Sequence, residues 1–192
     1  MKQLVALGAG ESGVGTALLA KSKGFEVLVS DAGKIKKKYE NVLSHQGIEF
    51  EENKHSKERI LESNIIVKSP GIPDTAPLVV ECRKKGIEVI GEIEFASRYF
   101  NGQLVGITGS NGKTTTTSLA YHLLSKGGLN PMLGGNIGES FARQVIDKTD
   151  GVAVLELSSF QLDDINSFRP NIAIILNITP DHLDRYDYKM EN

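Results

Sequence analysis

The chain has 192 residues, of which 40% are hydrophobic and 24% are charged, and its 22 basic and 24 acidic residues give a net charge of -2. A chain of this length is expected to form one or two small domains. Because the basic and acidic residues nearly balance, the composition argues against a protein that binds nucleic acid through electrostatic attraction.

The sequence also carries information about the compartment. Cys82 is the only cysteine, which excludes an internal disulfide and a cysteine-rich zinc site. The first apolar run reaches Gly8 before it is long enough for a signal sequence, and no run approaches the roughly 20 apolar residues of a membrane-spanning helix. We therefore expect a cytoplasmic protein that does not insert into a membrane.

Short apolar runs rich in β-branched residues alternate with stretches of helical spacing, which predicts an α/β fold with parallel sheets. The predicted strands are Gln3–Leu7, Glu26–Ser30, Ile65–Lys68, Glu88–Ile90, Leu104–Thr108, Val152–Leu157 and Ile172–Asn177. The predicted helices are Ser12–Lys23, Ala76–Lys85 and Lys113–Lys126. The last two should each turn an apolar face inward, formed by Leu78, Val79 and Cys82 in one and by Leu119, Leu123 and Leu124 in the other.

A glycine-rich loop, Gly8-Ala9-Gly10-Glu11-Ser12-Gly13, follows the first predicted strand and opens a helix, and Asp31 ends the second strand. Such a loop lets backbone N–H groups approach a diphosphate at a helix N-terminus, while the acid accepts a hydrogen bond from a ribose or base. The pattern suits NAD, FAD or a UDP-sugar equally. A plain strand-to-helix turn capped by Ser12 explains the residues about as well.

A second loop is more specific, because it places Gly-Lys-Thr at the junction of a strand and a helix. Its backbone is expected to cradle the phosphates of ATP through Gly109, Ser110, Asn111, Gly112, Lys113, Thr114 and Thr115. Lys113 would neutralise phosphate charge and the Thr114 hydroxyl would reach magnesium. The loop departs from the general phosphate-loop pattern, since Ile107 stands where the first glycine belongs.

The second loop restarts the strand–helix rhythm, so a domain boundary is predicted near 99–102. Residues 1–100 are expected to form a Rossmann-like domain and residues 101–192 the front part of a phosphate-loop α/β domain. After the last predicted strand the chain stops at Asn192 without a closing element. We expect that end to interrupt the second domain.

Further polar residues follow later strands. Glu156 ends a buried strand and would complete the magnesium shell, although it would serve equally as a helix-capping carboxylate beside Ser158. His182 follows the last predicted strand and would lie on the same rim. Ser158 lacks the surroundings of a hydrolase nucleophile.

Simpler roles are expected for other residues. The basic run at 34–38 is interpreted as a solvated helix face balanced by Glu51 and Glu52, and Cys82 as a core residue. The remaining histidines are interpreted as solvated; they are His45, His55 and His122.

Four segments taken together, at 108–115, 134–138, 156–162 and 176–186, resemble the Mur ligase family in both order and spacing. Phe-Gln-Leu after the serine pair and Asp-Arg-Tyr after the histidine resemble the members that add D-glutamate to UDP-N-acetylmuramoyl-L-alanine. The resemblance implies a first domain that holds the UDP part of the substrate and a middle ATPase domain. It also implies a C-terminal amino-acid-binding domain, which is absent from this sequence.

The resemblance assigns roles position by position. Ser12, Gly13, Asp31 and Gly71 would contact uridine or diphosphate, and the second glycine loop would hold ATP. Thr114 and Glu156 would hold one magnesium ion and His182 a second. Asn136 and Ser158 would lie near the muramoyl-alanine, and Lys113, Glu156 and His182 would serve catalysis.

The implied reaction is ATP-dependent amide formation through an acyl phosphate, in the synthesis of peptidoglycan precursors. The expected partners are small molecules, and the protein is expected to act as a monomer. The family's lysine carbamate would fall beyond Asn192. The chain is therefore expected to bind the UDP substrate without turnover. The alternative is an NAD- or UDP-binding module without ligase activity.

Overall fold

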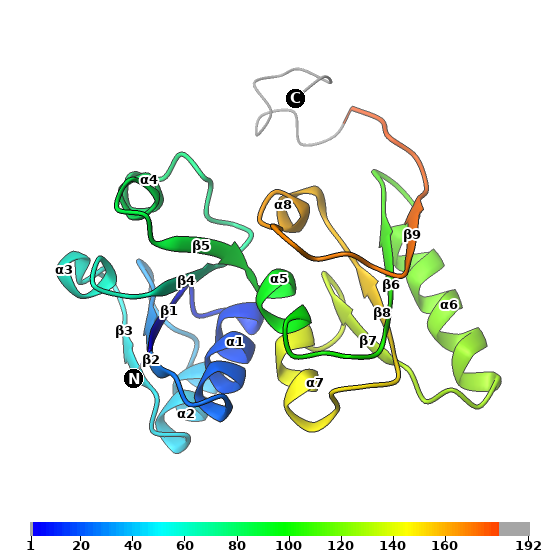
Figure 1. Ribbon diagram of the computed structural model, residues 1–192, viewed down its shortest axis with the longest axis horizontal. Coiled ribbons are helices and arrows are strands. Elements are labelled where there is room, and N and C mark those ends of the chain that lie inside the picture. Colours follow the sequence, from blue (N-terminus) through cyan, green and yellow to red (C-terminus); the bar gives the residue numbers. More distant parts are fainter. Residues whose placement is uncertain (1, 181–192) are drawn as a thin grey trace.

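The computed structural model describes residues 2–180. These residues form two parallel sheets, a five-stranded one of order β3-β2-β1-β4-β5 and a four-stranded one of order β7-β8-β6-β9 (Figure 1). Parallel pairing requires a crossover between neighbouring strands, and helices provide most of these crossovers. The predicted α/β fold with parallel sheets is confirmed.

The first sheet and its helices are built from residues 3–84 together with one further strand. The strands are β1 (Gln3–Leu7), β2 (Glu26–Ser30), β3 (Glu49–Glu51), β4 (Ile65–Lys68) and β5 (Glu88–Gly91). The helices are α1 (Glu11–Ser22), α2 (Lys37–His45), α3 (Lys57–Ile60) and α4 (Pro77–Lys84). We call this part the first unit.

A short buried helix, α5 (Glu92–Ser97), leads from β5 into the second sheet. The strands of that sheet are β6 (Gln103–Thr108), β7 (Met132–Gly135), β8 (Val152–Glu156) and β9 (Ile172–Ile175). The helices are α6 (Lys113–Lys126), α7 (Phe141–Asp147) and α8 (Ser159–Leu162). We call the part from β6 to β9 the second unit.

All seven predicted strands and three predicted helices are present, and each end differs from its prediction by at most two residues. The elements that sequence patterns did not predict are short or half-exposed: α2, β3, α3, α5, β7, α7 and α8. Their apolar residues are too few to establish a period, so composition alone does not distinguish them from loops.

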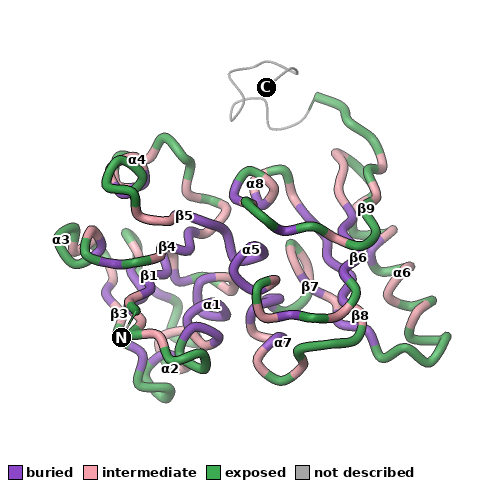
Figure 2. Tube along the Cα trace, in the orientation of Figure 1, coloured by how far each residue is buried: buried purple, intermediate pink, exposed green. Residues whose placement is uncertain are grey.

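Helix α1 lies between the first sheet and α7, so it is covered on both sides (Figure 1). Small residues make this close approach possible: a Cβ on Gly15 would collide with the Ser140 hydroxyl. One hydrophobic cluster runs from Leu19 in α1 through Phe95 in α5 to Phe141 and Leu155 in the second unit. Figure 2 shows the same continuity, with α5 buried at the centre of the molecule.

Helix α6 differs from its prediction. Leu124 packs against the second sheet, but Leu119 and Leu123 are 54% and 60% exposed. The expected inward face is therefore wrong for these two residues, because α6 lies on the outer side of the sheet with nothing described beyond it (Figure 1). In α4, by contrast, Val79 and Cys82 are buried as predicted. Across residues 2–180, no helix combines the length and apolarity needed to cross a membrane.

Candidate functional site

The loops that follow β1 and β4 meet at the C-terminal edge of the first sheet. The order in which the strands are added reverses between these two neighbouring strands. Ligands of open α/β sheets bind at such points. Gly8 has a φ of +91°, and a Cβ there would collide with the Ser69 side chain. A Cβ on Gly13 would collide with the Gly8 carbonyl oxygen, whereas Gly10 has open space around it. The loop thus needs Gly8 and Gly13 for its own packing and leaves the Gly10 backbone accessible.

Asp31 holds the glycine loop in place. Its Oδ2 accepts a hydrogen bond from the Ala9 amide at 2.7 Å, and its Oδ1 accepts one from the Gly33 amide at 2.8 Å. A carboxylate has further lone pairs, so these contacts leave capacity to accept a hydrogen bond from a ligand. Sequence reasoning assigned Asp31 to the ligand and missed its contact with the loop.

Ser12 does not cap α1, which corrects one of the alternatives for this loop. The helix begins at Glu11 and its N-cap is Gly10, with no side-chain cap. The Ser12 hydroxyl instead faces Glu92, a carboxyl that is 2% exposed. Burial raises the pKa of Glu92, although hydrogen bonds from the Ser140 hydroxyl and the Ala142 amide act in the opposite direction.

The structure brings the four residues assigned to the UDP moiety to one edge of the first sheet. Ser12 and Gly13 lie in the first turn of α1, Asp31 directly follows β2, and Gly71 lies in the loop after β4. Gly71 is exposed, and a Cβ there would meet no neighbour within 4 Å. Ser12 and Asp31 are half-exposed and Gly13 is buried, so a ligand at this edge would reach the first two side chains and only the backbone of the third.

A polar network directly behind Asp31 corrects two further expectations. The Ser30 hydroxyl donates to Glu51 Oε1 at 2.7 Å and lies 2.7 Å from His55 Nδ1. His55 is therefore not a freely solvated histidine. Glu51 is buried and also accepts the Ser56 amide, so it does not balance the basic run; burial raises its pKa, but these hydrogen bonds outweigh burial and lower it. His45 and His122 are exposed as expected.

The second glycine loop joins β6 to α6. Gly112 precedes the helix with a φ of +85°, and the first-turn amides of α6 have no intrahelical partner. Lys113 folds back over the loop, and its Nζ donates to the Gly109 and Ser110 carbonyls at 2.6 and 3.0 Å. Thr114 and Thr115 are exposed at the start of the helix. The arrangement can accept phosphate oxygens on backbone amides and an ammonium group.

Asn177 fastens this loop to the end of β9, a role that sequence reasoning missed. Its backbone carbonyl accepts the Ser110 amide at 3.0 Å. Its side-chain Oδ1 accepts the Asn111 amide and its Nδ2 donates to the Asn111 carbonyl, both at 2.9 Å. The sequence placed this asparagine at the end of a predicted strand, but nothing in the pattern indicated its partner 66 residues earlier.

Glu156 ends β8 beside the glycine loop and is 1% exposed. Its Oε1 accepts a hydrogen bond from Asn136 Nδ2 at 2.9 Å, while its Oε2 has no hydrogen-bond partner in the described part of the chain. A Cβ on Gly135 would collide with the Glu156 carbonyl, so only glycine fits before Asn136. A buried carboxylate oxygen without a partner fits a cation ligand.

The residues around Glu156 suit a magnesium ion only when substrate phosphates supply some of its ligands. Among residues 2–180, no group of three or more His, Cys, Asp or Glu side chains is placed to hold a metal. Magnesium is commonly held by one or two carboxylates together with substrate phosphates and water. Glu156, the Thr114 hydroxyl and phosphate oxygens would supply such a set. His182, the predicted second ligand, lies outside the described residues.

Ser158 rather than Glu156 caps α8, which corrects the alternative role considered for Glu156. The Ser158 hydroxyl accepts the Gln161 amide at 3.3 Å, and the Gln161 side chain accepts the Ser158 amide at 3.0 Å. This reciprocal pair is a capping box. Ser158 is half-exposed next to the buried Glu156 and Leu157, which leaves one side of it open to a ligand.

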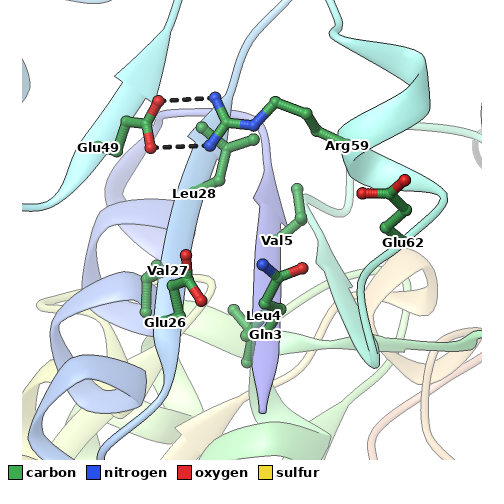
Figure 3. Close-up of a pocket in the computed structure, with 9 residues that line it drawn as sticks. All are labelled: Gln3, Leu4, Val5, Glu26, Val27, Leu28, Glu49, Arg59 and Glu62. Atoms are coloured by element: carbon green, nitrogen blue, oxygen red, sulfur yellow. Dashed lines mark hydrogen bonds and ion pairs between the residues drawn. The ribbon is translucent and has the colours of Figure 1, made fainter. Parts of the chain in front are cut away.

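A hollow of about 60 Å³ lies elsewhere, at the N-terminal ends of the strands of the first sheet (Figure 3). Arg59 spans it with two hydrogen bonds to Glu49, at 2.6 and 2.7 Å. Its lining includes none of the predicted site residues. Because ligands of parallel sheets bind at the opposite edge, we do not place the functional site here.

Comparison with protein families gives two matches. Residues 2–91 match the family described as Mur ligase MurD-like, N-terminal domain, and residues 107–192 match the family described as Mur ligase middle domain. The chain is 58% identical over 191 residues to the UDP-N-acetylmuramoylalanine–D-glutamate ligase of Christiangramia forsetii, and 56% identical over 192 residues to that of Bacteroides fragilis. It is covered completely in both comparisons and spans 43% of the length of each relative.

Solved structures show the same fold. The UDP-N-acetylmuramate–alanine ligase MurC of Thermotoga maritima superposes with a TM-score of 0.64 at 24% identity, over all of this chain and 45% of that one. The UDP-N-acetylmuramate:L-alanyl-γ-D-glutamyl-meso-diaminopimelate ligase of Neisseria meningitidis superposes with a TM-score of 0.63 at 26% identity, over 97% of this chain and 63% of that one.

Proposed function

Because this chain belongs to the Mur ligase family, we propose that it serves the ATP-dependent addition of D-glutamate to UDP-N-acetylmuramoyl-L-alanine, a step of peptidoglycan precursor synthesis in the cytoplasm. Three relatives that carry the name of this reaction are 55–58% identical over the whole chain. Since the chain spans 43% of their length, the proposal for the chain itself is narrower. We propose that the chain itself binds the UDP substrate and carries part of the ATP site.

The UDP moiety would bind at the edge formed by the first glycine loop, Asp31 and the loop after β4. The N-terminus of α1 provides unpaired amides and a partial positive charge for the diphosphate. The open space at Gly10 supports a close backbone approach. Asp31 would accept a hydrogen bond from uracil or ribose with the lone pairs that its two backbone contacts leave free.

ATP would bind on the second glycine loop. Its phosphates would replace the Gly109 and Ser110 carbonyls as partners of Lys113 Nζ, and would use the amides at the start of α6. Magnesium, held by Thr114, Glu156 and phosphate oxygens, would supply positive charge against the transferred phosphoryl group. Asn136 fixes the carboxylate of Glu156 by its hydrogen bond to Oε1, which leaves Oε2 for the cation.

The reaction joins two anions, which sets the main electrostatic demand. A carboxylate oxygen of the L-alanine moiety attacks the γ-phosphorus of ATP, the bond to the bridging oxygen breaks, and ADP leaves. The amine of D-glutamate then attacks the acyl phosphate, losing a proton and releasing phosphate as the amide forms. Lys113 lowers the cost of the first step by placing a cation against the γ-phosphate.

One observation carries the proposal: Oε2 of Glu156 has no hydrogen-bond partner among residues 2–180, and it lies beside a glycine loop with Lys113 at a helix N-terminus. An NAD-binding module has no use for this second constellation. The orphaned oxygen is costly in a buried position unless a cation or proton occupies it. It therefore supports phosphoryl chemistry over a role limited to dinucleotide binding.

Phosphate release with and without D-glutamate tests the proposal, with the 192-residue chain beside a longer homologue that includes the C-terminal region. We expect D-glutamate-dependent release from the longer protein and none from the 192-residue chain. Half a site cannot orient the amine against the acyl phosphate. Release by the 192-residue chain would mean that residues beyond Asn192, including the expected lysine carbamate, are dispensable. No release from the longer protein would overturn the ligase assignment.

A further inference from the structure

A buried ion pair joins the first unit to the second. Lys68 is the last residue of β4, and its Nζ lies 2.6 Å from Oδ2 of Asp164, which follows α8. Both side chains are 1% exposed. The two residues are 96 positions apart in sequence. The pair therefore fixes the segment after α8 against the C-terminal edge of the first sheet.

The backbone of Asp164 takes part in the same contact. Its carbonyl accepts a hydrogen bond from the Gly91 amide at 3.0 Å, at the end of β5. A Cβ on Gly91 would lie only 3.0 Å from the Asp164 Cβ, so glycine permits the close approach. Asp164 is thus held at the ends of β4 and β5, by its side chain at one strand and by its main chain at the other.

Lys68 also reaches the loop that follows it. Its Nζ donates to the Ile72 carbonyl at 2.9 Å, which closes the loop of residues 69–72. The Ser69 side chain of that loop packs directly against Gly8 of the first glycine loop. One ammonium group therefore contacts the loop proposed to bind UDP and the segment that follows Ser158 and Gln161.

The charged residues next to the Lys68–Asp164 pair are too exposed to take its place. Asp74 lies 3.4 Å from Lys68 Nζ, and Arg83 lies 2.9 Å from Asp74 and 3.9 Å from Asp164 Oδ1, but Asp74 and Arg83 are 43% and 45% exposed. Burial raises the pKa of Asp164, and Lys68 is the main group that lowers it. A buried ion pair often adds little to stability compared with an apolar pair of similar size. Its presence is better explained by the geometry that it imposes.

We propose that Lys68 and Asp164 are positioning residues that hold the loop of residues 69–72 in its UDP-binding conformation and couple that loop to the α8 segment of the second unit. The inference rests on the proposed UDP site. It assigns to this pair a role in ligand affinity that goes beyond holding the two units together.

The double variant Lys68→Met/Asp164→Leu separates affinity from stability. Two apolar side chains of similar volume fill the same space, so we expect the variant to fold with a Tm within a few degrees of the wild type. It cannot hold the Ile72 carbonyl, so its affinity for UDP should fall at least tenfold by calorimetry. Arg83→Met, which alters only the exposed rim of the cluster, is the matched control and should leave the UDP affinity unchanged.

A folded double variant that binds UDP as tightly as the wild type would overturn the inference. Hydrogen exchange on the wild-type chain gives a second test that does not depend on any variant folding. Saturating UDP should slow exchange of the amides at 161–165, in the second unit. Unchanged exchange there while UDP binds would overturn the coupling. Failure of the wild type to bind UDP at all would instead overturn the proposed function, and this inference with it.

Discussion

The two glycine-rich loops occupy equivalent places at the ends of β1 and β6, yet different kinds of contact hold them. The first is fixed by backbone packing, since Gly8 and Gly13 admit no side chain, and by the Asp31 carboxylate, which accepts the Ala9 amide. The second is fixed by polar contacts instead: the Lys113 ammonium on its carbonyls, and the side chain and backbone carbonyl of Asn177 on its amides. A ligand at the first loop therefore binds to a rigid surface, whereas phosphates at the second loop would replace the carbonyl partners of Lys113.

This difference suits the two proposed ligands. A preformed loop loses little conformational entropy when it binds, which favours stable binding of the UDP anchor. The second loop has to follow a phosphoryl group whose charge changes during the reaction, and a flexible ammonium can do so.

Gly13→Ala should have the largest effect, because its methyl group would collide with the Gly8 carbonyl. We expect a loss of about 3 kcal/mol in unfolding free energy and loss of detectable UDP binding. Gly10→Ala is the matched control in the same loop, where the space is open. It should keep the wild-type stability in urea denaturation. Equal stability of the two variants would show that the first loop is not held by packing.

Glu94 in α5 should show the next largest effect. Burial raises its pKa, but hydrogen bonds from the Ser167 hydroxyl and the amides of Ser167, Phe168 and Asn166 outweigh burial and lower its pKa to about 2. The folded-state pKa is thus below the ordinary 4.5, so its contribution is complete above pH 4.5 and is lost as the pH falls toward 2. A shift of this size corresponds to about 3 kcal/mol.

Glu94→Gln should therefore lower the unfolding free energy at pH 7 by about 2 kcal/mol, since the amide keeps only one acceptor oxygen. It should also flatten the dependence of Tm on pH between 4.5 and 2. Because Glu94 binds residues 166–168 of the second unit, this variant measures how much that contact adds to the stability of the protein. A wild-type pH slope in the variant would contradict the assignment.

Lys113→Met removes the ammonium group that contacts the second glycine loop. The variant should weaken binding of magnesium-ATP at least tenfold, about 1.4 kcal/mol, because the phosphates lose their ammonium partner. UDP binding should be unchanged, since the first loop does not depend on Lys113. Thermal shifts with each ligand measure both effects. A parallel loss of UDP affinity would show that the two loops are not independent.

Glu92→Gln should have the smallest effect. Burial raises the pKa of Glu92, so its charged form costs stability above pH 4.5 and the cost disappears below that pH. An amide keeps an acceptor for Ser140 and Ala142 and carries no charge. We expect unchanged or slightly higher stability at pH 7, within about 0.5 kcal/mol. A clear destabilisation would indicate that the carboxylate has a charged partner.

The sequence allowed prediction of the strands and the glycine loops because both depend on local chemistry. Apolar β-branched runs form buried strands wherever they occur, and glycines at a strand–helix junction mark a close turn. Partners such as Asn177 for Asn111 and Asp164 for Lys68 were not predictable, since they lie 66 and 96 residues apart and no period connects them. The exposed leucines of α6 show the same limit. Periodicity identifies the apolar face of a helix but not whether another element packs against it.

Calorimetric titration of the 192-residue chain with UDP-N-acetylmuramoyl-L-alanine and, separately, with NAD tests directly which ligand the first glycine loop selects. The first loop is preformed and, on our account, selects the UDP substrate without help from the second. We therefore predict one-to-one binding of the UDP substrate, equal in Lys113→Met, and no measurable binding of NAD. Tight NAD binding with no response to the UDP substrate would contradict the account and favour a dinucleotide-binding module.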